Sequence, residues 1–157
     1  MIKKILFVCT GNTCRSPMAQ VLLESKISKD TSLQPAGIEV DSAGTRSTYS
    51  GAMSGAVEVM RDYGLDLTAH QSKPLDGGLV SWADLILVMG PEHVHEVISR
   101  FPAAESKTFL LSRYVGEEGH VPDPYGNGIE AYRECAALLQ LLLSRFADKL
   151  RSKSAGE

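Results

Sequence analysis

Two continuous apolar runs stand out along the chain. The first spans residues 5–8 and the second residues 85–89. Strands that are buried on both faces of a parallel sheet read as uninterrupted apolar runs of this length, so both runs are predicted to be such strands. Shorter runs at 38–40 and 109–111 are bounded by Gly, Pro, Ser or charged residues and are predicted to be two weaker strands.

Between these runs, apolar residues recur every three or four positions, which predicts amphipathic helices. Pro17 opens one helix and Pro91 another, because proline suits the first turn of a helix. A third helix is predicted over residues 51–63, and the longest from about Ile129 to Leu150. The apolar face of the longest helix, expected to cover one side of the sheet, is formed by Ile129, Tyr132, Ala136, Leu139, Leu143, Phe146 and Leu150.

The predicted strands and helices alternate along the chain. Such alternation is typical of α/β proteins, and we predict a small doubly wound sheet of about four parallel strands flanked by helices. A chain of 157 residues is large enough for one well-buried core and contains no linker-like stretch, so residues 1–157 are predicted to form a single domain. Folds of this kind bind ligands at the carboxyl ends of their strands. That rule directs attention to the segment after residues 5–8.

The segment Cys9–Ser16 follows the first strand directly and leads into the helix that Pro17 opens. After the cysteine it consists of Thr10, Gly11, Asn12, Thr13, Cys14, Arg15 and Ser16. A chain that turns from strand into helix at this point directs successive backbone N–H groups inward, and the helix N-terminus adds positive potential. We therefore predict an anion loop after the first strand that binds a tetrahedral dianion.

Two side chains of this loop have the chemistry needed for phosphoryl transfer. A thiolate is favoured at the mouth of a positively polarised loop, so Cys9 is predicted to be a nucleophile. Arg15 carries a planar, permanently charged guanidinium that can bind two phosphoryl oxygens at once. The departing atom must receive a proton, and Asp123 is the candidate acid, because the prolines on both sides of it restrict its backbone.

These three residues predict a reaction in two steps. Cys9 attacks phosphorus while Asp123 protonates the leaving group, and Asp123 then activates water to hydrolyse the phosphocysteine. Arg15 and the loop N–H groups stabilise charge on the phosphoryl oxygens throughout. No cofactor is required. The four histidines do not share metal-ligand spacing with the cysteines, so no metal site is predicted.

Composition narrows the partners and the compartment. A formal net charge of −3 without a basic stripe speaks against nucleic-acid binding. No segment approaches the roughly eighteen apolar residues of a membrane span, so no membrane partner is expected. Three cysteines without a disulfide spacing pattern suit a reducing compartment. We expect a cytoplasmic protein, with nothing that indicates an oligomeric state beyond the monomer.

Over nearly its whole length the chain resembles the low-molecular-weight protein tyrosine phosphatases. The resemblance rests on four motifs in order: residues 8–17, residues 41–45, His70 and residues 123–125. It implies a cysteine-dependent phosphatase that hydrolyses phosphorylated protein substrates through a phosphocysteine. It implies Cys9 as nucleophile, Arg15 as transition-state clamp and Asp123 as general acid and base. The scaffold that it implies around the loop consists of Asn12, Ser16, Ser42 and His70.

The resemblance also bears on substrate and regulation. Thr13 stands where members that look like protein-arginine phosphatases carry threonine, whereas tyrosine-directed members tend to carry a larger aliphatic residue. Tyr125 has no second aromatic residue beside it, whereas many tyrosine-directed relatives have one there. The ring of Tyr125 can stack on a phenyl or a guanidinium group. We therefore predict a modest preference for phosphoarginine over phosphotyrosine. A second loop cysteine can form a reversible disulfide in this family, so Cys9 and Cys14 are a predicted redox pair.

Three other functions stay open. The first is a phosphotyrosine-specific phosphatase. The second is a thioredoxin-coupled arsenate reductase, which has a similar loop but uses further cysteines, and residues 72–89 contain none. The third is a non-catalytic phosphate-binding module, which needs neither Cys9 nor Asp123. Of the remaining residues, Asp41 is expected to be a solvated charge without a partner, and Cys135 a structural residue of the longest helix.

Overall fold

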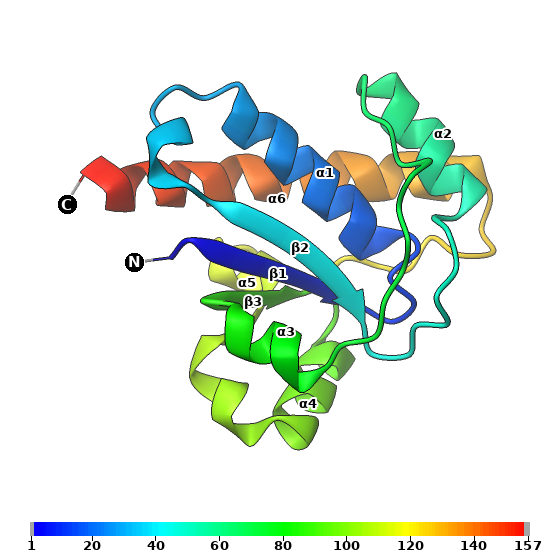
Figure 1. The fold of residues 1–157 in the computed structure, drawn as a ribbon. Coiled ribbons are helices and arrows are strands. Elements are labelled where there is room, and N and C mark those ends of the chain that lie inside the picture. The colour runs from blue at the N-terminus through cyan, green and yellow to red at the C-terminus, as the bar shows by residue number, and fades with distance from the viewer. Residues whose placement is uncertain (1, 156–157) are drawn as a thin grey trace.

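The computed structural model describes residues 2–155, which form a four-stranded sheet with helices on both faces (Figure 1). The strands are β1 (Lys4–Cys9), β2 (Glu39–Gly44), β3 (Leu85–Val88) and β4 (Thr108–Leu110). Their order in the sheet is β2-β1-β3-β4, and each neighbouring pair is parallel. The prediction of a small doubly wound α/β fold is therefore confirmed.

Helices cover both faces of this sheet. They are α1 (Arg15–Ser28), α2 (Ser54–Asp62), α3 (Gly77–Trp82), α4 (Pro91–Arg100), α5 (Leu111–Tyr114) and α6 (Ile129–Ala155), with short 3₁₀ turns at Gln34–Ala36 and Pro102–Lys107. In Figure 1, α1 and α6 lie together on one side of the sheet, and α3 and α4 lie on the other. This two-sided cover explains why β1 and β3 read as uninterrupted apolar runs.

The central strand β1 is anchored on both faces. Ile5, Phe7 and Cys9 belong to the buried cluster that includes residues of α1, α2 and α6. Leu6 and Val8 belong to the opposite cluster, which includes residues of α3 and α4. Successive side chains of a strand point to opposite faces, so this division follows directly from the pleat. Packing on both faces thereby fixes β1 within the core. Cys9 is the last residue of the strand and is itself part of the core.

Helix α2 begins later than the periodicity over residues 51–63 predicted. Its first residue is Ser54, because the segment before it is used to contact the loop after β1. The backbone N–H of Met53 donates to the carbonyl oxygen of Thr13 at 2.9 Å. A tertiary hydrogen bond therefore decides this boundary rather than local helix propensity.

Two further boundaries have local causes. The strand predicted at 109–111 is β4 at 108–110, because Leu111 is the first residue of α5. The sequence did not predict α3. Asp76 caps this short helix, since its side chain accepts a hydrogen bond from the Leu79 N–H at 2.8 Å.

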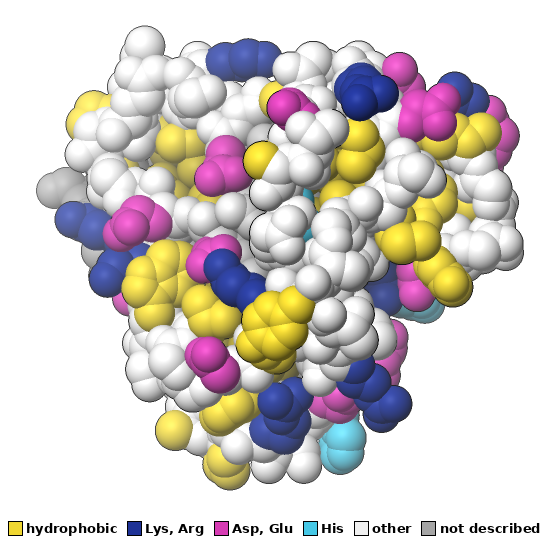
Figure 2. Space-filling model, turned by 45° about the vertical axis from the view of Figure 1, so that its right-hand side comes forward, with side chains coloured by type: hydrophobic (Ala, Val, Ile, Leu, Met, Phe, Trp, Pro, Cys, Tyr) yellow, Lys and Arg dark blue, Asp and Glu magenta, His cyan; other side chains and the backbone are white. Residues whose placement is uncertain are grey.

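The surface carries charges of both signs. On the face shown in Figure 2, acidic and basic side chains are interspersed with hydrophobic ones rather than gathered into a stripe of one sign. Within residues 2–155, no helix combines the length and the apolar character needed to cross a membrane.

Candidate active site

The predicted anion loop leaves the carboxyl end of β1 and turns into the N-terminus of α1. Cys9 is the last residue of the strand and Arg15 the first of the helix. The Thr45 N–H, just beyond β2, donates to the carbonyl oxygen of Cys9 at 2.9 Å. Gly44 permits this approach, because a Cβ there would lie 2.6 Å from the carbonyl oxygen of Thr10. The end of β2 therefore holds the start of the loop.

Asn12 is the buried centre of the loop and adopts a left-handed backbone, with φ of 56°. Its side-chain oxygen accepts from the Lys73 N–H at 3.1 Å. Its amide nitrogen donates to Ser16 Oγ at 2.8 Å and to Ser42 Oγ at 2.9 Å. His70 Nε2 donates to the Asn12 carbonyl oxygen at 2.8 Å, and burial lowers the pKa of His70, which favours the neutral ring. All four predicted scaffold residues, two in the loop and two outside it, are joined by this network.

This network favours one direction for the hydrogen bond between Ser16 and Cys9. Ser16 Oγ already accepts a proton from Asn12, so its own proton is free to point at Cys9 Sγ, 2.9 Å away. Ser42 Oγ likewise accepts from Asn12 and donates to Gln20 Oε1 at 2.7 Å. A donor directed at sulfur stabilises the thiolate over the thiol. The arrangement therefore favours a nucleophilic sulfur in the loop.

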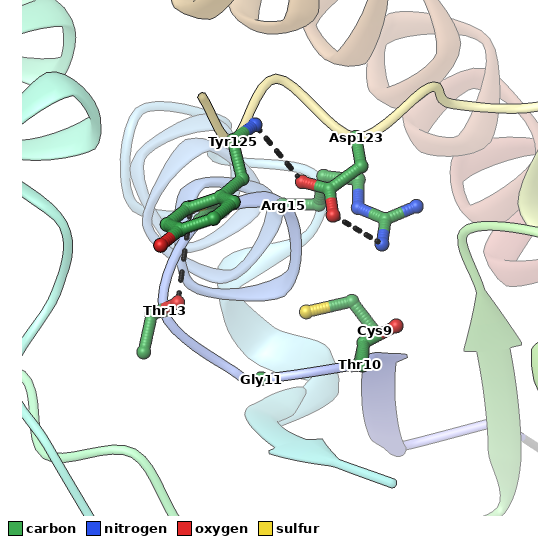
Figure 3. Close-up of a pocket in the computed structure, with 8 residues that line it drawn as sticks. Cys9, Thr10, Gly11, Thr13, Arg15, Asp123 and Tyr125 are labelled. Atoms are coloured by element: carbon green, nitrogen blue, oxygen red, sulfur yellow. Dashed lines mark hydrogen bonds and ion pairs between the residues drawn. The ribbon is translucent and has the colours of Figure 1, made fainter. Parts of the chain in front are cut away.

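Arg15 and Asp123 lie side by side next to Cys9 (Figure 3). The Arg15 side chain is only 5% exposed, and its Nη2 lies 3.7 Å from Asp123 Oδ2. Its Nη1 donates to the carbonyl oxygen of Val121 at 3.0 Å. The Asp123 side chain is 51% exposed, and its Oδ1 accepts from the Tyr125 N–H at 3.1 Å. The guanidinium is thus held from behind, whereas the carboxylate is open to solvent.

A pocket of about 200 Å³ lies between these groups. It is lined by Cys9, Thr10, Gly11, Thr13, Cys14, Arg15, Asp123 and Tyr125. The structure therefore brings the predicted nucleophile, clamp and acid to one cavity from opposite ends of the chain. Tyr125 is 63% exposed, and Figure 3 shows it on the side of the pocket opposite Thr10 and Gly11. In the part of the chain that the structure describes, no group of three or more His, Cys, Asp or Glu side chains is placed to hold a metal ion.

The three cysteines are free thiols in different surroundings. Cys14 is buried, and its Sγ lies 3.5 Å from Tyr132 Oη and 3.8 Å from Thr13 Oγ1. Burial raises the pKa of the Cys14 thiol. Cys135 is buried in α6, where burial raises its pKa to about 12. Cys14 lines the same pocket as Cys9, whereas Cys135 is not among the residues that line it.

The expectation that Asp41 has no partner is wrong. Its carboxylate accepts hydrogen bonds from Lys73 Nζ at 2.6 and 2.7 Å. This ion pair lies beside the scaffold, because the backbone of the same lysine bonds Asn12. Gln20 was missed as well, although it follows Ser16 by one turn of α1, a spacing that places both on one side of the helix.

Two other contacts of the anion loop could hardly be predicted from the sequence: Val121 with Arg15, and His93 with Thr10. Val121 acts on Arg15 through its carbonyl oxygen, and a backbone atom is independent of residue type. The sequence position of His93 indicates no role, because it lacks metal-ligand spacing to the cysteines. It is fully buried, and its Nε2 lies 2.8 Å from Thr10 Oγ1 in the loop.

Comparisons with known proteins identify the family. The model of the family described as low molecular weight phosphotyrosine protein phosphatase matches residues 4–155. A protein-arginine-phosphatase of Geobacillus stearothermophilus is 42% identical over 152 residues, which are 96% of this chain and 97% of that protein. The probable low molecular weight protein-tyrosine-phosphatase EpsP of Ralstonia nicotianae is 39% identical over 158 residues, 97% of this chain and 99% of that protein. The solved structure of the YwlE arginine phosphatase from Geobacillus stearothermophilus matches with a TM-score of 0.90 at 40% identity, covering 99% of this chain and 97% of that chain.

Proposed function

Because this chain belongs to the low-molecular-weight protein tyrosine phosphatase family and is a phosphatase, we propose that it hydrolyses phosphorylated protein side chains through a phosphocysteine, with a modest preference for phosphoarginine. The alternative is a phosphotyrosine-specific enzyme. One observation supports the proposal most strongly: the Cys9 sulfur, the Arg15 guanidinium and the Asp123 carboxyl border a single pocket.

In the first step, the Cys9 sulfur attacks phosphorus as the bond between phosphorus and the leaving nitrogen or oxygen breaks. The Ser16 hydroxyl, 2.9 Å from the Cys9 sulfur, can donate a hydrogen bond to it and so stabilise negative charge on the attacking atom. Arg15 and the N–H groups of the loop bind the phosphoryl oxygens and stabilise charge as it develops. Asp123 gives its proton to the leaving group, which departs as a neutral guanidine or phenol.

In the second step, Asp123 works in reverse. Its carboxylate takes a proton from water, the water oxygen attacks phosphorus, and the sulfur–phosphorus bond breaks. The products are inorganic phosphate and the Cys9 thiolate, and Asp123 is again protonated for the next cycle. The half-exposed position of Asp123 suits this role, because both the leaving group and the water must reach it.

The preference for phosphoarginine is supported by Thr13 and by the relatives. Thr13 lines the pocket with a hydroxyl where a larger alkyl side chain would favour an aryl ring. A polar guanidine is compatible with that hydroxyl, and the exposed ring of Tyr125 can stack on a guanidinium plane. The Geobacillus stearothermophilus relative is named a protein-arginine-phosphatase, whereas the Ralstonia relative is named a probable tyrosine phosphatase.

A redox function of Cys14 forms part of the proposal. A peroxide would oxidise the Cys9 thiolate to a sulfenic acid, and the Cys14 thiol would then displace water to form a disulfide, losing its proton. Inactivation by peroxide should therefore be reversed by an added thiol in the wild-type protein. In Cys14→Ser the same treatment should oxidise Cys9 further, and added thiol should restore less activity.

The deciding experiment is kcat/KM on matched phosphoarginine and phosphotyrosine peptides without added metal. Neutral pH is required because the phosphorus–nitrogen bond is labile in acid. A tenfold preference for phosphoarginine, which corresponds to about 1.4 kcal/mol of transition-state binding, supports the proposed substrate. Thr13→Ile should move the ratio towards phosphotyrosine. Thr31→Ile, the same change at an exposed threonine, should leave it unchanged.

A rapid-quench experiment separates the other classes of function. A phosphatase of this mechanism acquires the mass of one phosphoryl group on Cys9 when it turns over a phosphopeptide. An arsenate reductase or a non-catalytic phosphate-binding module acquires none. Absence of turnover on both peptides together with absence of phosphocysteine contradicts the proposed function.

A further inference from the structure

His93 is a buried histidine that the two reaction steps leave unused. It occupies the third position of α4, and its ring Nδ1 accepts a hydrogen bond from the Gly90 N–H at 3.0 Å. A backbone N–H is only a donor, so Nδ1 carries no proton. In the neutral ring the proton must then be on Nε2, which lies 2.8 Å from Thr10 Oγ1. His93 therefore donates to Thr10 with a defined tautomer.

The charges around the ring support this assignment. Burial, and after it the positive charge of Arg15, lowers the pKa of His93, while Glu92, Glu96 and Asp123 oppose that shift. The carboxylate nearest to Nε2 belongs to Glu92, but it is 3.7 Å away and exposed, which is beyond hydrogen-bond distance. Thr10 is thus the acceptor for a neutral His93.

A hydroxyl that accepts a hydrogen bond retains its own proton for donation. Thr10 lines the phosphate pocket next to Cys9, and its carbonyl oxygen is held by the Arg46 N–H at 2.8 Å. Arg46 therefore holds the backbone of Thr10 and His93 holds its side-chain oxygen, so that only the hydroxyl proton can still change direction. A phosphoryl group in the pocket would offer the acceptor for it.

We infer that His93 is a positioning residue of the phosphate site, because its Nε2–H fixes the Thr10 hydroxyl as a hydrogen-bond donor to a phosphoryl oxygen. The inference rests on the proposed function in so far as the pocket must take a phosphoryl group. It adds the Thr10 hydroxyl to the backbone donors of the loop, and it gives α4 an indirect part in anion binding through His93.

The first test removes the hydroxyl. Thr10→Val keeps the shape of the side chain, and a hydrogen bond to a charged group is typically worth a ten- to hundredfold change, so kcat/KM on an aryl phosphate should fall by roughly tenfold or more. The inhibition constant of inorganic phosphate should rise in parallel. Thr10→Ser, which retains the hydroxyl, should stay near wild type. Wild-type phosphate affinity in Thr10→Val overturns the inference.

The second test asks whether His93 acts through Thr10. His93→Leu should weaken phosphate binding in the wild-type background but have no further effect in the Thr10→Val background. His93→Gln, which can donate from its amide, should recover part of the loss. His95→Leu makes the same change at an exposed histidine of α4 and serves as the matched control. Additive losses from His93→Leu and Thr10→Val show a general structural role and overturn the inference.

A measurement without substitution covers the case in which His93→Leu does not fold. Nitrogen-15 NMR of the wild-type imidazole rings should show His93 as the neutral Nε2–H tautomer, and an Nδ1–H tautomer overturns the inference. Calorimetric titration with inorganic phosphate keeps this test separate from the proposed function. Phosphate binding that weakens in Thr10→Val, together with the Nε2–H tautomer of His93, supports the inference even if no phosphopeptide is turned over.

Discussion

The two sides of the pocket are built in opposite ways. The anion loop, residues 9–16, is largely buried. Hydrogen bonds with Ser42 of β2, with Thr45 just after it, with Lys73 and with His93 of α4 hold it. The acid segment, residues 121–125, presents Asp123 and Tyr125 to solvent, with a hydrogen bond between them as local support. Groups that stabilise developing charge act best when they are already in place, whereas a group that protonates a leaving group and activates water must be accessible.

The acid segment is tied to the sheet at its first residue. The Val121 N–H donates to the carbonyl oxygen of Met89, just after β3, at 2.9 Å, and the Val121 carbonyl accepts from Arg15. Beyond this point Pro122, Asp123 and Tyr125 are exposed, although Pro124 between them is buried. Only two positions therefore separate Val121, which is buried and bonded to Arg15, from the half-exposed Asp123. Because the anion loop is buried and the acid is exposed, substitutions on the two sides of the pocket should have different consequences.

The largest effect is expected from Cys9→Ser. A serine hydroxyl at this position has no base to activate it, so kcat should fall by at least about a thousandfold. The measurement is single-turnover kinetics on a phosphopeptide. Cys135→Ala, which alters a buried cysteine outside the pocket, should turn over near the wild-type rate. Substantial turnover by Cys9→Ser contradicts the assignment of the nucleophile.

The next largest effect is expected from Asp123→Asn. Loss of the acid should lower kcat by about 10²- to 10⁴-fold, and the loss should be greater for poor leaving groups than for an activated nitrophenol. Because the side chain is half exposed, the melting temperature should barely change. Asp62→Asn, an exposed carboxylate of α2, is the control. An equal loss for good and poor leaving groups would show that Asp123 does not transfer the proton.

Asn12→Ala tests the stability of the anion loop itself. It leaves the Lys73 N–H without its acceptor and removes the donor to Ser16 and Ser42, and a buried group left unpaired typically costs about 1–3 kcal/mol. Urea unfolding should show this loss of stability together with reduced activity. Asn127→Ala, in the exposed turn after the acid segment, should leave the free energy of unfolding nearly unchanged. Equal stabilities of the two variants would remove the contrast between the two sides.

The smallest effect concerns pH. Burial lowers the pKa of His70 in the fold, so at mildly acidic pH the unfolded chain binds more protons than the folded one. The stability linked to His70 is complete above its unfolded pKa of about 6.5 and is lost as pH falls towards the lower folded value. His70→Gln should therefore flatten the dependence of unfolding free energy on pH below about 6.5. His95→Gln, on the surface of α4, should keep the wild-type slope.

Local signals in the sequence were sufficient for much of the fold and for the anion loop. The apolar run of β1, the polar loop after it and Pro17 are contiguous, so strand, turn and helix follow from neighbouring residues. Helix α2 shows the limit of such reasoning, since its start depends on the hydrogen bond between Met53 and Thr13. Asp41 is a second example of this limit, because its partner Lys73 is distant in the sequence.

The sequence by itself therefore determined the parallel α/β fold, the anion loop with Cys9 and Arg15, and Asp123 as the candidate acid, because each depends on residue type and local spacing. Only the tertiary structure decided that Asp123 lies 3.7 Å from Arg15 and that His93 lies 2.8 Å from Thr10. These distances depend on where the carboxyl ends of separate strands meet. That meeting point is set by packing of the whole core, which no local pattern of residues records.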